Sequence, residues 1–454
     1  MLYFLIKLMA ITAIRTFFNK ISAENVDYIA KDTPIIFTAN HPNTMMDPMI
    51  IGYTCKRKLH FFAKSTLFNN LIAGWFLRRI QIVPVYRKVD DPSKMDQNKE
   101  TFSKGYEILK QNKAFLIFPE GISTGDRKLS QIKTGAARIG FGAEAENDWQ
   151  LGVQIIPVGL NYANAIKFRS DVSTRFGQPI QLTDFRDVYE QNEKEAVHLV
   201  TEQIETALSK LTINLKDLEM QEIVEALERI YKQELAVDLG LETENKADDF
   251  SVTKGLINAV EWYYENEPSK VNEFKGMLNL YQRLLNRLQI KDEFLDPASS
   301  RVTFWERIKA ILYIIIMFPI YLYGLINNVI PYKFPRWYAR HFVQHKAEVA
   351  PWKMLSGTII FLIYYFIEII IFASLTGSFI WTFIYALSLI PSGNFVLQYI
   401  NRVSDYRQHL RFISIFYKKR TLIYELIKQR TEIIDLLNSY KIEYMDTMGL
   451  NTEK

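Results

Sequence analysis

The chain has 454 residues, enough for two or three domains, and 48% of them are apolar. Lysine and arginine outnumber aspartate and glutamate by 55 to 50, and the resulting net charge of +5 is too small to indicate nucleic-acid binding. The one cysteine, Cys55, excludes an intrachain disulfide. His341 and His345 have a metal-binding spacing for a helix but no obvious third ligand, so we expect no metal site and no bound cofactor.

The first twenty residues, MLYFLIKLMAITAIRTFFNK, are mostly apolar. They differ from a secretory signal because Lys7 and Arg15 interrupt the run and no small-residue cleavage site follows. The uncharged stretch 8–14 is too short to span a bilayer. We predict an amphipathic helix over residues 1–24 that lies in the membrane surface. The alternative is an ordinary helix packed on the domain that follows.

Short strand-like runs alternate with helix-like stretches over residues 25–212. The runs rich in β-branched and aromatic residues are 34–38, 58–63, 81–86, 114–118 and 153–162. Helical patterns lie between them, for example at 99–111 and 134–145. This alternation predicts an α/β domain with a mixed, largely parallel sheet flanked by helices. In such folds the chemistry collects beyond the ends of the strands.

The sequence becomes charged and helix-favouring over residues 213–300. One helical face there collects apolar residues, namely Met277, Tyr281, Leu284, Leu285 and Leu288. We predict a small helical region without a catalytic motif.

Long apolar segments occupy much of residues 301–400. Residues 310–332 carry no charge and contain Pro319, whereas Glu368 is the only charged residue between Lys353 and Arg402. We predict a two-helix membrane hairpin over 354–400 and a segment 310–332 that turns back at Pro319 or lies along the interface. Three full spans are the alternative.

Basic residues flank each of these apolar segments, which favours a cytoplasmic position for all the flanks. Glu368 inside a span indicates either a functional site or a polar contact with a neighbouring helix. We expect an amphipathic helical tail over 401–454, packed either on the helical region or on the membrane surface.

The stretch NHPNTMMDP, residues 40–48, follows the first apolar run of the α/β domain. His41 and Asp47 there could form a catalytic pair at the end of a strand. The simpler alternative makes Asp47 a helix N-cap, Pro48 the first helical residue and His41 a loop residue.

Three further stretches place polar residues at or just after predicted strand ends: FFAKSTLF, IVPVYR, and IFPEGIST with the IKTG that follows it. Their candidate residues are Lys64, Arg87, Glu120, Gly121, Ser123 and Lys133. A last apolar strand reads IIPVGLNY. Because strand ends of one sheet converge, these residues are expected to line one cleft.

These stretches together resemble the glycerolipid acyltransferase family of the lysophosphatidate type. That family has an Asn-His…Asp block, a lysine shortly before Leu-Phe, Pro-Val-x-Arg, Phe-Pro-Glu-Gly and a late Pro-Val strand. All five blocks occur here in that order over about residues 35–162. The resemblance implies an acyltransferase-type α/β fold, here followed by the helical region and membrane segments.

Two departures from the family pattern concern the acceptor. Five residues separate His41 from Asp47, where the commonest form has four, and this resembles a branch that includes glycerol-3-phosphate and dihydroxyacetone-phosphate acyltransferases. The usual Thr-Arg after Phe-Pro-Glu-Gly is Ile122-Ser123, so Arg127 or Lys128 would have to replace the missing arginine.

The roles follow from the chemistry of acyl transfer to an alcohol. A neutral histidine suits the general base, here His41, and a carboxylate behind it, Asp47, fixes its tautomer and stabilises the imidazolium. No covalent intermediate is required. An acceptor phosphate would be bound by Lys64, Arg87 and Lys133, with help from backbone N–H groups around Gly121. Glu120 would shape that loop or bind an acceptor hydroxyl.

The resemblance implies acyl-CoA or acyl carrier protein as donor and lysophosphatidate as first-choice acceptor, giving phosphatidate. Glycerol-3-phosphate (or dihydroxyacetone phosphate) is second and another lysolipid third. The partners are therefore the bilayer, these acceptors and these donors, with the active site at the cytoplasmic face of the membrane.

Two alternatives come from other classes of protein. Gly121-Ile-Ser123-Thr-Gly125 fits the nucleophile elbow of a serine lipase or esterase, with Asp187 and His198 completing a triad. A membrane scaffold could also use an inactive acyltransferase domain to hold lipid.

Overall fold

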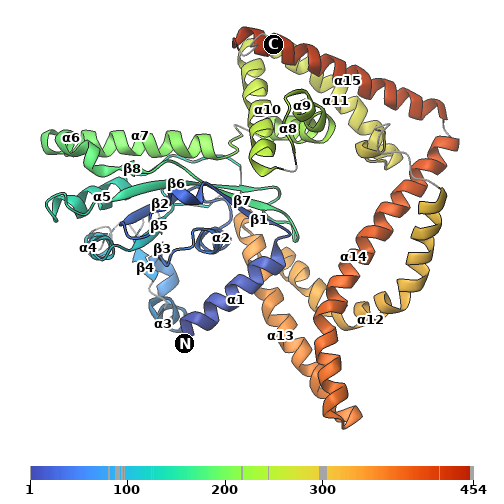
Figure 1. Cartoon of the computed structure of the whole chain (residues 1–454), viewed down its shortest axis with the longest axis horizontal. Helices are drawn as coiled ribbons and strands as arrows, with labels where there is room; N and C mark the ends of the chain where they lie inside the picture. Colours follow the sequence, from blue (N-terminus) through green and yellow to red (C-terminus); the bar gives the residue numbers. More distant parts are fainter. Residues whose placement is uncertain are drawn as a thin grey trace. The chain divides into compact units, whose positions relative to one another are not determined.

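The computed structural model describes the chain except residues 1, 80–81, 87–92, 94–95, 97, 124, 126, 216–217, 244, 296–303, 419 and 450–454. The chain divides into two compact units (Figure 1). The first comprises residues 1–214 and 334–360, and the second comprises residues 215–333 and 361–454.

The first unit is built on an eight-stranded mixed sheet. Its strands are β1 (Ile21–Glu24), β2 (Ile35–Ala39), β3 (Leu59–Lys64), β4 (Ile82–Val85), β5 (Ala114–Ile117), β6 (Gln154–Tyr162), β7 (Val172–Phe176) and β8 (Ile180–Gln181). The order is β1-β7-β6-β2-β5-β3-β4, with β8 beside β6. Pairs β6–β7 and β6–β8 are antiparallel and the others are parallel. The predicted α/β fold with a largely parallel sheet is confirmed.

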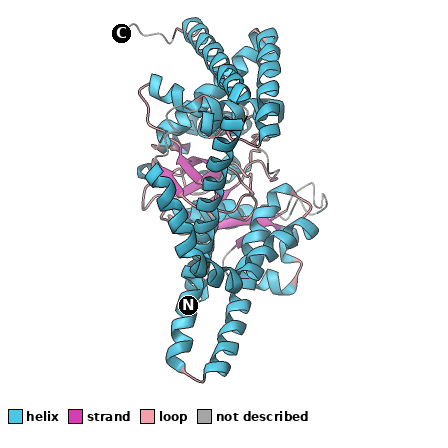
Figure 2. Cartoon of the chain, turned by 90° about the vertical axis from the view of Figure 1, so that its right-hand side faces the viewer, coloured by secondary structure: helices cyan, strands magenta, loops and turns pink. Residues whose placement is uncertain are grey.

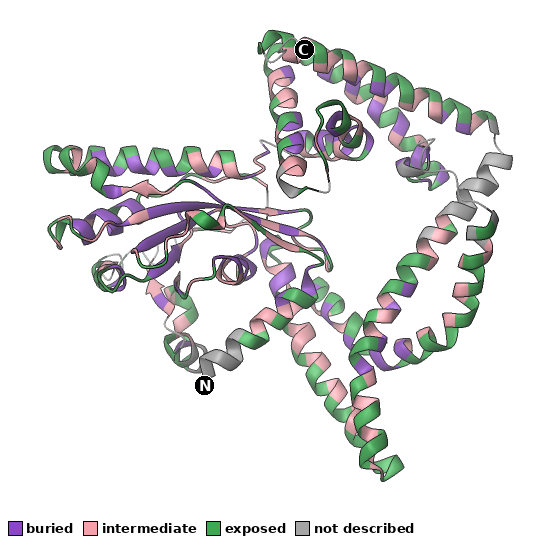
Figure 3. Cartoon of the chain, viewed as in Figure 1, coloured by how far each residue is buried: buried purple, intermediate pink, exposed green. Residues whose placement is uncertain are grey.

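Helices cover both faces of this sheet. All five residues of β2 are buried, as expected for a strand between two helical layers (Figure 3). Ile35 and Phe37 point into a core shared with α1 (Leu2–Phe17) and α2 (Met46–Thr54). Ile36 points to the opposite core, which contains residues of three further helices. These are α4 (Asn98–Lys110), α5 (Gly135–Ala145) and α7 (Glu193–Leu211).

The remaining helical elements of the sheet domain are short. They are α3 (Leu71–Arg79), α6 (Arg186–Gln191) and the 3₁₀ turns η1 (Val26–Tyr28), η2 (Ser65–Phe68) and η4 (Leu182–Phe185).

The N-terminal helix differs from the prediction at its end. It stops at Phe17, and residues 21–24 instead form the edge strand β1, which pairs with β7. Ile14, Phe17 and Phe18 are buried in the sheet core, whereas Leu8 and Met9 are about half exposed. The end of α1 therefore packs on the domain, and its placement in the membrane surface stays a prediction.

The second unit contains the predicted helical region. Its helical elements are α8 (Leu218–Ile230), α9 (Lys232–Asp238), α10 (Lys246–Asn266), α11 (Pro268–Leu288), η5 (Asp292–Leu295) and the tail helix α15 (Arg420–Thr447). Ile423, Leu426 and Ile433 of the tail belong to the same buried core as residues of α8, α10 and α11. Of the two positions considered for the tail, the structure therefore has it packed on the helical region.

Within the described residues, three helices are long and apolar enough to cross a membrane, judged by length and composition: α12 (Phe304–Phe342), α13 (Val349–Thr376) and α14 (Phe379–Lys418). Figures 1 and 2 show α13 and α14 meeting at a turn, where Gly377 has a positive φ of 60°. The expected return of the chain at Pro319 is wrong, because α12 continues through it. Proline is tolerated in membrane helices since neighbouring groups and local adjustments satisfy the freed carbonyl.

Candidate active site

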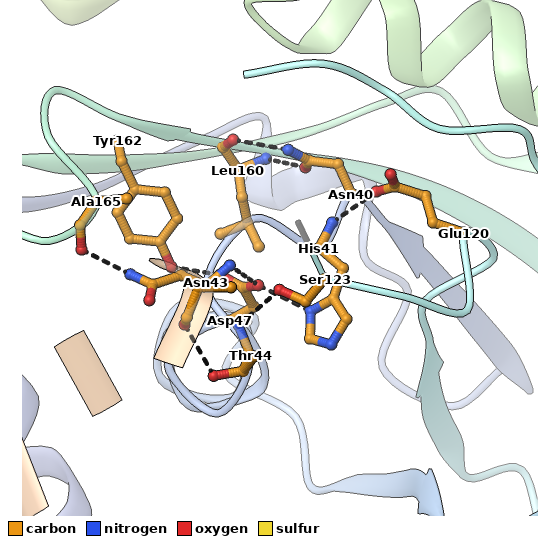
Figure 4. A network of polar contacts seen from close by, with 11 residues as sticks. Asn40, His41, Asn43, Thr44, Asp47, Glu120, Ser123, Leu160, Tyr162 and Ala165 are labelled. Atoms are coloured by element: carbon orange, nitrogen blue, oxygen red, sulfur yellow. Dashed lines mark hydrogen bonds and ion pairs between the residues drawn. The ribbon is translucent and has the colours of Figure 1, made fainter. Parts of the chain in front are cut away.

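The sheet positions the motif histidine and aspartate against each other. His41 follows β2 directly, and Asp47 lies in the first turn of α2. The Nδ1 atom of His41 is 2.8 Å from Oδ2 of Asp47 (Figure 4). The Asp47 side chain is fully buried, whereas the His41 side chain is 18% exposed, so the imidazole can be reached from solvent.

The simpler alternative, a helix cap, does not describe Asp47. The N-cap of α2 is Met45, which makes no side-chain capping hydrogen bond, and Pro48 is the third helical residue. The Asp47 carboxylate instead accepts a hydrogen bond from the backbone N–H of Asn43, 2.7 Å away, in the loop before the helix.

Neutral donors hold the buried Asp47 carboxylate. Besides the Asn43 N–H, the Tyr162 hydroxyl donates to Oδ1 over 2.5 Å. Burial, and then the charge of Asp47, raise the pKa of Tyr162 well above its usual value, so this hydroxyl keeps its proton and acts as a donor. A buried carboxylate needs such partners to offset its lost hydration.

Two further contacts fix His41, one through its ring and one through its backbone. It stacks on Phe118 with ring centroids 3.8 Å apart and an interplanar angle of 12°. Its backbone N–H donates to Oε1 of Glu120 over 2.8 Å. Because a carboxylate only accepts, we assign the proton between the side chains to Nδ1, which leaves a lone pair on Nε2. Nε2 can then take a proton from a hydroxyl group.

Asn40 ties the same loop to the neighbouring strand β6. Its side-chain amide donates to the carbonyl of Leu160 over 3.0 Å and accepts from the Leu160 N–H over 2.7 Å. This two-way bond fixes the chain immediately before His41, beside the strand that ends in Tyr162 (Figure 4).

Glu120 joins two loops at the end of β5. The side chain is buried, Oε1 accepts from the His41 N–H, and Oε2 accepts from the Ser130 N–H over 2.8 Å. Both carboxylate oxygens are therefore engaged with the backbone. This arrangement favours loop shaping, the first of its two expected roles.

Gly121 and Lys133 are brought together. Gly121 has φ 70°, and a Cβ placed there would lie 2.4 Å from Nζ of Lys133, so a side chain at this position would displace the amine. The backbone N–H of Lys133 also donates to the carbonyl of Pro119 over 2.9 Å. The exposed Lys64 ends β3, whose parallel neighbour β5 leads to Glu120. Arg87 lies outside the described residues.

Ser123 does not have the surroundings of a serine nucleophile. Its Oγ accepts a hydrogen bond from the Thr44 N–H over 3.1 Å, and the described residues between β5 and α5 contain no helix that would follow an elbow. His198 is 66% exposed on α7 and lies 3.5 Å from Glu202. These contacts do not support the alternative of a serine triad with His198.

Arg127, considered as a replacement for the missing arginine of the family, contacts the backbone. One of its terminal nitrogens, Nη2, donates to the carbonyls of Tyr162 and Ala163 over 3.0 and 2.6 Å. In the part of the chain that the structure describes, no group of three or more histidine, cysteine, aspartate or glutamate side chains could hold a metal ion.

Sequence reasoning missed several residues that complete the site. Asn43 and Tyr162 bind Asp47, and Phe118 supports the ring of His41. Tyr162 ends the strand IIPVGLNY, whose neighbour β2 leads to His41, so its position at the end of a core strand was an available signal.

Comparison with known proteins agrees with this geometry. Residues 20–161 match the family described as Acyltransferase. Glycerol-3-phosphate O-acyltransferase 1 of Saccharomyces cerevisiae is 25% identical over 283 residues, which are 58% of this chain and 36% of the yeast protein. 1-acyl-sn-glycerol-3-phosphate acyltransferase of Streptococcus pneumoniae is 28% identical over 192 residues, 41% of this chain and 64% of that protein.

Among solved structures, the 1-acyl-sn-glycerophosphate (LPA) acyltransferase of Thermotoga maritima is 21% identical with a TM-score of 0.33, covering 46% of this chain and 79% of that one. The chain spans less than two thirds of the length of the curated relatives it matches. Residues 20–161 thus match the Acyltransferase family, with the five sequence blocks in order and Glu120 of one block in contact with His41 of another, and this part of the chain is similar to glycerol-3-phosphate and 1-acyl-sn-glycerol-3-phosphate acyltransferases.

Proposed function

We propose that the chain is a membrane-bound O-acyltransferase that moves a fatty acyl group from acyl-CoA or acyl carrier protein to a hydroxyl of a glycerol phosphate acceptor. The observation that carries this proposal is the contact of 2.8 Å between His41 and the buried Asp47 at the end of β2. With the proton between the two side chains on Nδ1, Nε2 of His41 would be the general base that the reaction requires.

In the proposed reaction, Nε2 of His41 removes the proton of the acceptor hydroxyl as its oxygen attacks the thioester carbonyl carbon. Asp47 stabilises the imidazolium that forms. The tetrahedral intermediate then expels the thiolate, and the imidazolium returns the proton to it. The products are the new ester and the free thiol of the carrier. The acyl group never bonds to the protein.

The acceptor phosphate would be bound by cations beside this pair. Lys133 lies over Gly121, and Lys64 ends a strand of the same parallel set, so both amines are candidates, together with Arg87. Backbone N–H groups around Gly121 would add to this anion site.

Lysophosphatidate is our first candidate acceptor, which would make the product phosphatidate. Glycerol-3-phosphate is the second, favoured by the five residues between His41 and Asp47 and by the longest of the alignments above, that with the yeast glycerol-3-phosphate O-acyltransferase. The acyl donor is acyl-CoA or acyl carrier protein. Since these donors are soluble and the products are lipids, the site would face the cytoplasmic surface of the membrane.

The membrane attachment is part of the proposal. The helix α1 would lie in the interface and the pair α13 and α14 would form a hairpin. The helix α12 is long enough to span, but it would not cross the bilayer in this arrangement, because Ala347 after it contacts Thr44 of the sheet domain. Chains with two and with three spans differ in the side on which the tail α15 lies. Protease accessibility of a tag at the C-terminus would distinguish them.

The test is an acyl-transfer assay on full-length protein purified in detergent, with His41→Ala alongside. Palmitoyl-CoA and a palmitoylated acyl carrier protein are each offered with lysophosphatidate and, separately, with glycerol-3-phosphate. Phosphatidate formed only by the unaltered protein supports the first acceptor, and lysophosphatidate formed from glycerol-3-phosphate supports the second. Absence of transfer with every pair would contradict the proposal and would favour the alternative of a non-catalytic, lipid-binding scaffold.

A further inference from the structure

A segment about three hundred residues downstream packs on the loop that carries the motif. Residues 346–353, here called the support segment, comprise the turn η6 (Lys346–Glu348) and the start of α13, and they belong to the same compact unit as the sheet. They lie outside the 20–161 region that matches the family.

The support segment holds Thr44, which has an unusual backbone conformation. Thr44 has φ 34°, a positive value that is costly for a β-branched residue and persists only where the surroundings enforce it. Its hydroxyl donates to the carbonyl of Ala347 over 3.1 Å, and its N–H donates to Ser123. One of the two bonds that fix this conformation therefore comes from the support segment.

Close packing accompanies this hydrogen bond. Ala347 and Ala350 are almost fully buried, and Ala350 belongs to the same apolar cluster as Met46 and Ile50 of α2. A Cβ added to Gly125 would lie 2.9 Å from the backbone nitrogen of Ala347. The support segment therefore contacts both loops beside His41, at Thr44 and at Gly125.

The support segment also reaches the motif loop indirectly, through the loop that connects β6 and β7. Nζ of Lys353 donates to the carbonyl of Ile166 over 3.0 Å, and the side chain of Asn43 donates to the adjacent carbonyl of Ala165 over 2.8 Å (Figure 4). Asn43 is also the residue whose N–H binds Asp47. Lys353 and Asn43 thus fix neighbouring carbonyls of one loop.

We infer that the support segment is a positioning element of the acyl-transfer site, in addition to being the start of an apolar helix. Through Thr44 and Lys353 it holds residues 43–47 in the conformation that aims the Asp47 carboxylate at His41. The site is completed by a segment from the C-terminal half, so attachment to the membrane and the geometry of catalysis are mechanically joined. This inference rests on the proposed function.

The experiment uses full-length protein in nanodiscs and two pairs of variants. Thr44→Val removes the hydroxyl and keeps the shape, whereas Thr44→Ser keeps the hydroxyl. Lys353→Met removes the donor, whereas Lys353→Arg keeps one. Thr358→Val is the matched control, because in the described structure its hydroxyl donates within α13, to the carbonyl of Met354.

We expect Thr44→Val and Lys353→Met to lower kcat by about tenfold, with KM for both substrates changed by less than about twofold, since a small misplacement of reacting groups affects the chemical step. Thr44→Ser, Lys353→Arg and Thr358→Val should stay near the unaltered protein. Normal kcat in both Thr44→Val and Lys353→Met would overturn the inference, and so would an equal loss in Thr358→Val.

A measurement that needs no substrate keeps this test separate from the proposed function. Hydrogen exchange of peptides covering residues 40–50 should be faster in Thr44→Val and Lys353→Met and unchanged in Thr358→Val. If the chain transfers no acyl group at all, the proposed function fails, and exchange still decides whether the segment supports the loop. Unchanged exchange in both variants would overturn the inference.

Glycine substitutions test the packing directly. Gly125→Ala would press on the support segment, whereas Gly240→Ala has a similar positive φ (68° against 79°) but no atom within 4 Å of the added Cβ. We expect faster exchange over residues 40–50 only in Gly125→Ala. The same exchange pattern in both variants would show that backbone strain, and not contact with residues 346–353, is responsible.

Discussion

Two buried aspartates of this chain, Asp47 and Asp292, each accept a hydrogen bond from a buried tyrosine, yet their other partners differ. Arg430 of α15 lies 3.2 and 3.3 Å from the two carboxylate oxygens of Asp292, which also accepts from Tyr281. Asp47 has neutral donors, Asn43 and Tyr162, and the partly exposed His41.

The difference shows how one residue type serves two purposes. A cation beside Asp292 neutralises its charge and joins the tail helix to the helical region, which is a structural role. In the part of the chain that the structure describes, the hydrogen-bond partners of Asp47 include no arginine or lysine, so its charge remains available to stabilise an imidazolium on His41. The comparison predicts that one aspartate governs the reaction rate and the other governs stability.

The largest expected effect comes from the active-site pair. Asp47→Asn and His41→Ala should each lower kcat by about 100-fold or more, because the general base and its orientation are lost. Expression and membrane insertion should persist, as measured by yield and by carbonate extraction. A near-normal rate for Asp47→Asn would show that this side chain holds the loop at Asn43 and has no role in catalysis.

The reciprocal substitution is Asp292→Asn. It leaves the partly buried Arg430 without its counter-charge, so the free energy of unfolding should fall by about 3 kcal/mol. Denaturant unfolding followed by circular dichroism measures this. Activity per folded molecule should be unchanged, and a specific loss of kcat in this variant would break the comparison.

Substitution of the tyrosines that bind the two aspartates, Tyr162 and Tyr281, should have smaller effects than substitution of the aspartates. Tyr162→Phe removes a hydrogen bond to an ionised carboxylate, which is worth about 1.5 kcal/mol, so kcat should fall by about tenfold with little change in KM. Tyr281→Phe should lower stability by a similar free energy and leave kcat unchanged. Equal effects of both substitutions on kcat would contradict separate roles.

The buried histidine His60 of β3 should make the stability of the protein depend on acidic pH. Burial, and then the charges of Lys113 and Lys58, lower the pKa of His60, whose Nε2 is buried without a hydrogen-bond partner in the described structure. In the unfolded chain His60 binds a proton near pH 6.5, whereas in the folded chain it does so only at a lower pH. The free energy of unfolding should therefore decrease as the pH falls below 6.5, by at most about 1.4 kcal/mol per pH unit from this group.

His60→Phe should therefore flatten the decline of the thermal midpoint between about pH 6.5 and 5. A thermal midpoint with the same pH dependence in both proteins would show that His60 is not the group that titrates.

Ser123→Ala should have the smallest effect. The hydroxyl is an acceptor for the Thr44 N–H, so its loss should lower kcat by about threefold through the loop alone. Fluorophosphonate should not label the unaltered protein. Labelling at Ser123, or loss of all activity in Ser123→Ala, would favour the serine hydrolase alternative.

Local patterns in the sequence predicted most of the sheet and the members of the site. Strands β2, β3, β4, β5 and β6 coincide with the apolar runs to within one or two residues, because core strands need continuous apolar residues. The convergence of His41, Glu120, Gly121 and Lys133 followed from the rule that parallel strand ends share one edge.

Contacts between segments that are far apart in the chain could not be predicted from the sequence. The edge strand β1 forms only because β7 lies beside it, and its four residues ISAE carry no strong strand pattern. Tyr162 donates a hydrogen bond to Asp47 although the two residues are 115 positions apart in the sequence. Thr44 and Ala347, which are also hydrogen-bonded, are 303 positions apart. Pro319 indicated a break that the long helix α12 does not have.

The most direct test of the account is a single-turnover reaction of full-length protein in nanodiscs with ¹⁴C-palmitoyl-CoA and lysophosphatidate. The account predicts labelled phosphatidate and free CoA from the unaltered protein, none from His41→Ala, and no radiolabel on the protein at any time. Radiolabel that stays on the protein, or equal transfer by His41→Ala, would contradict direct base catalysis by the His41 and Asp47 pair.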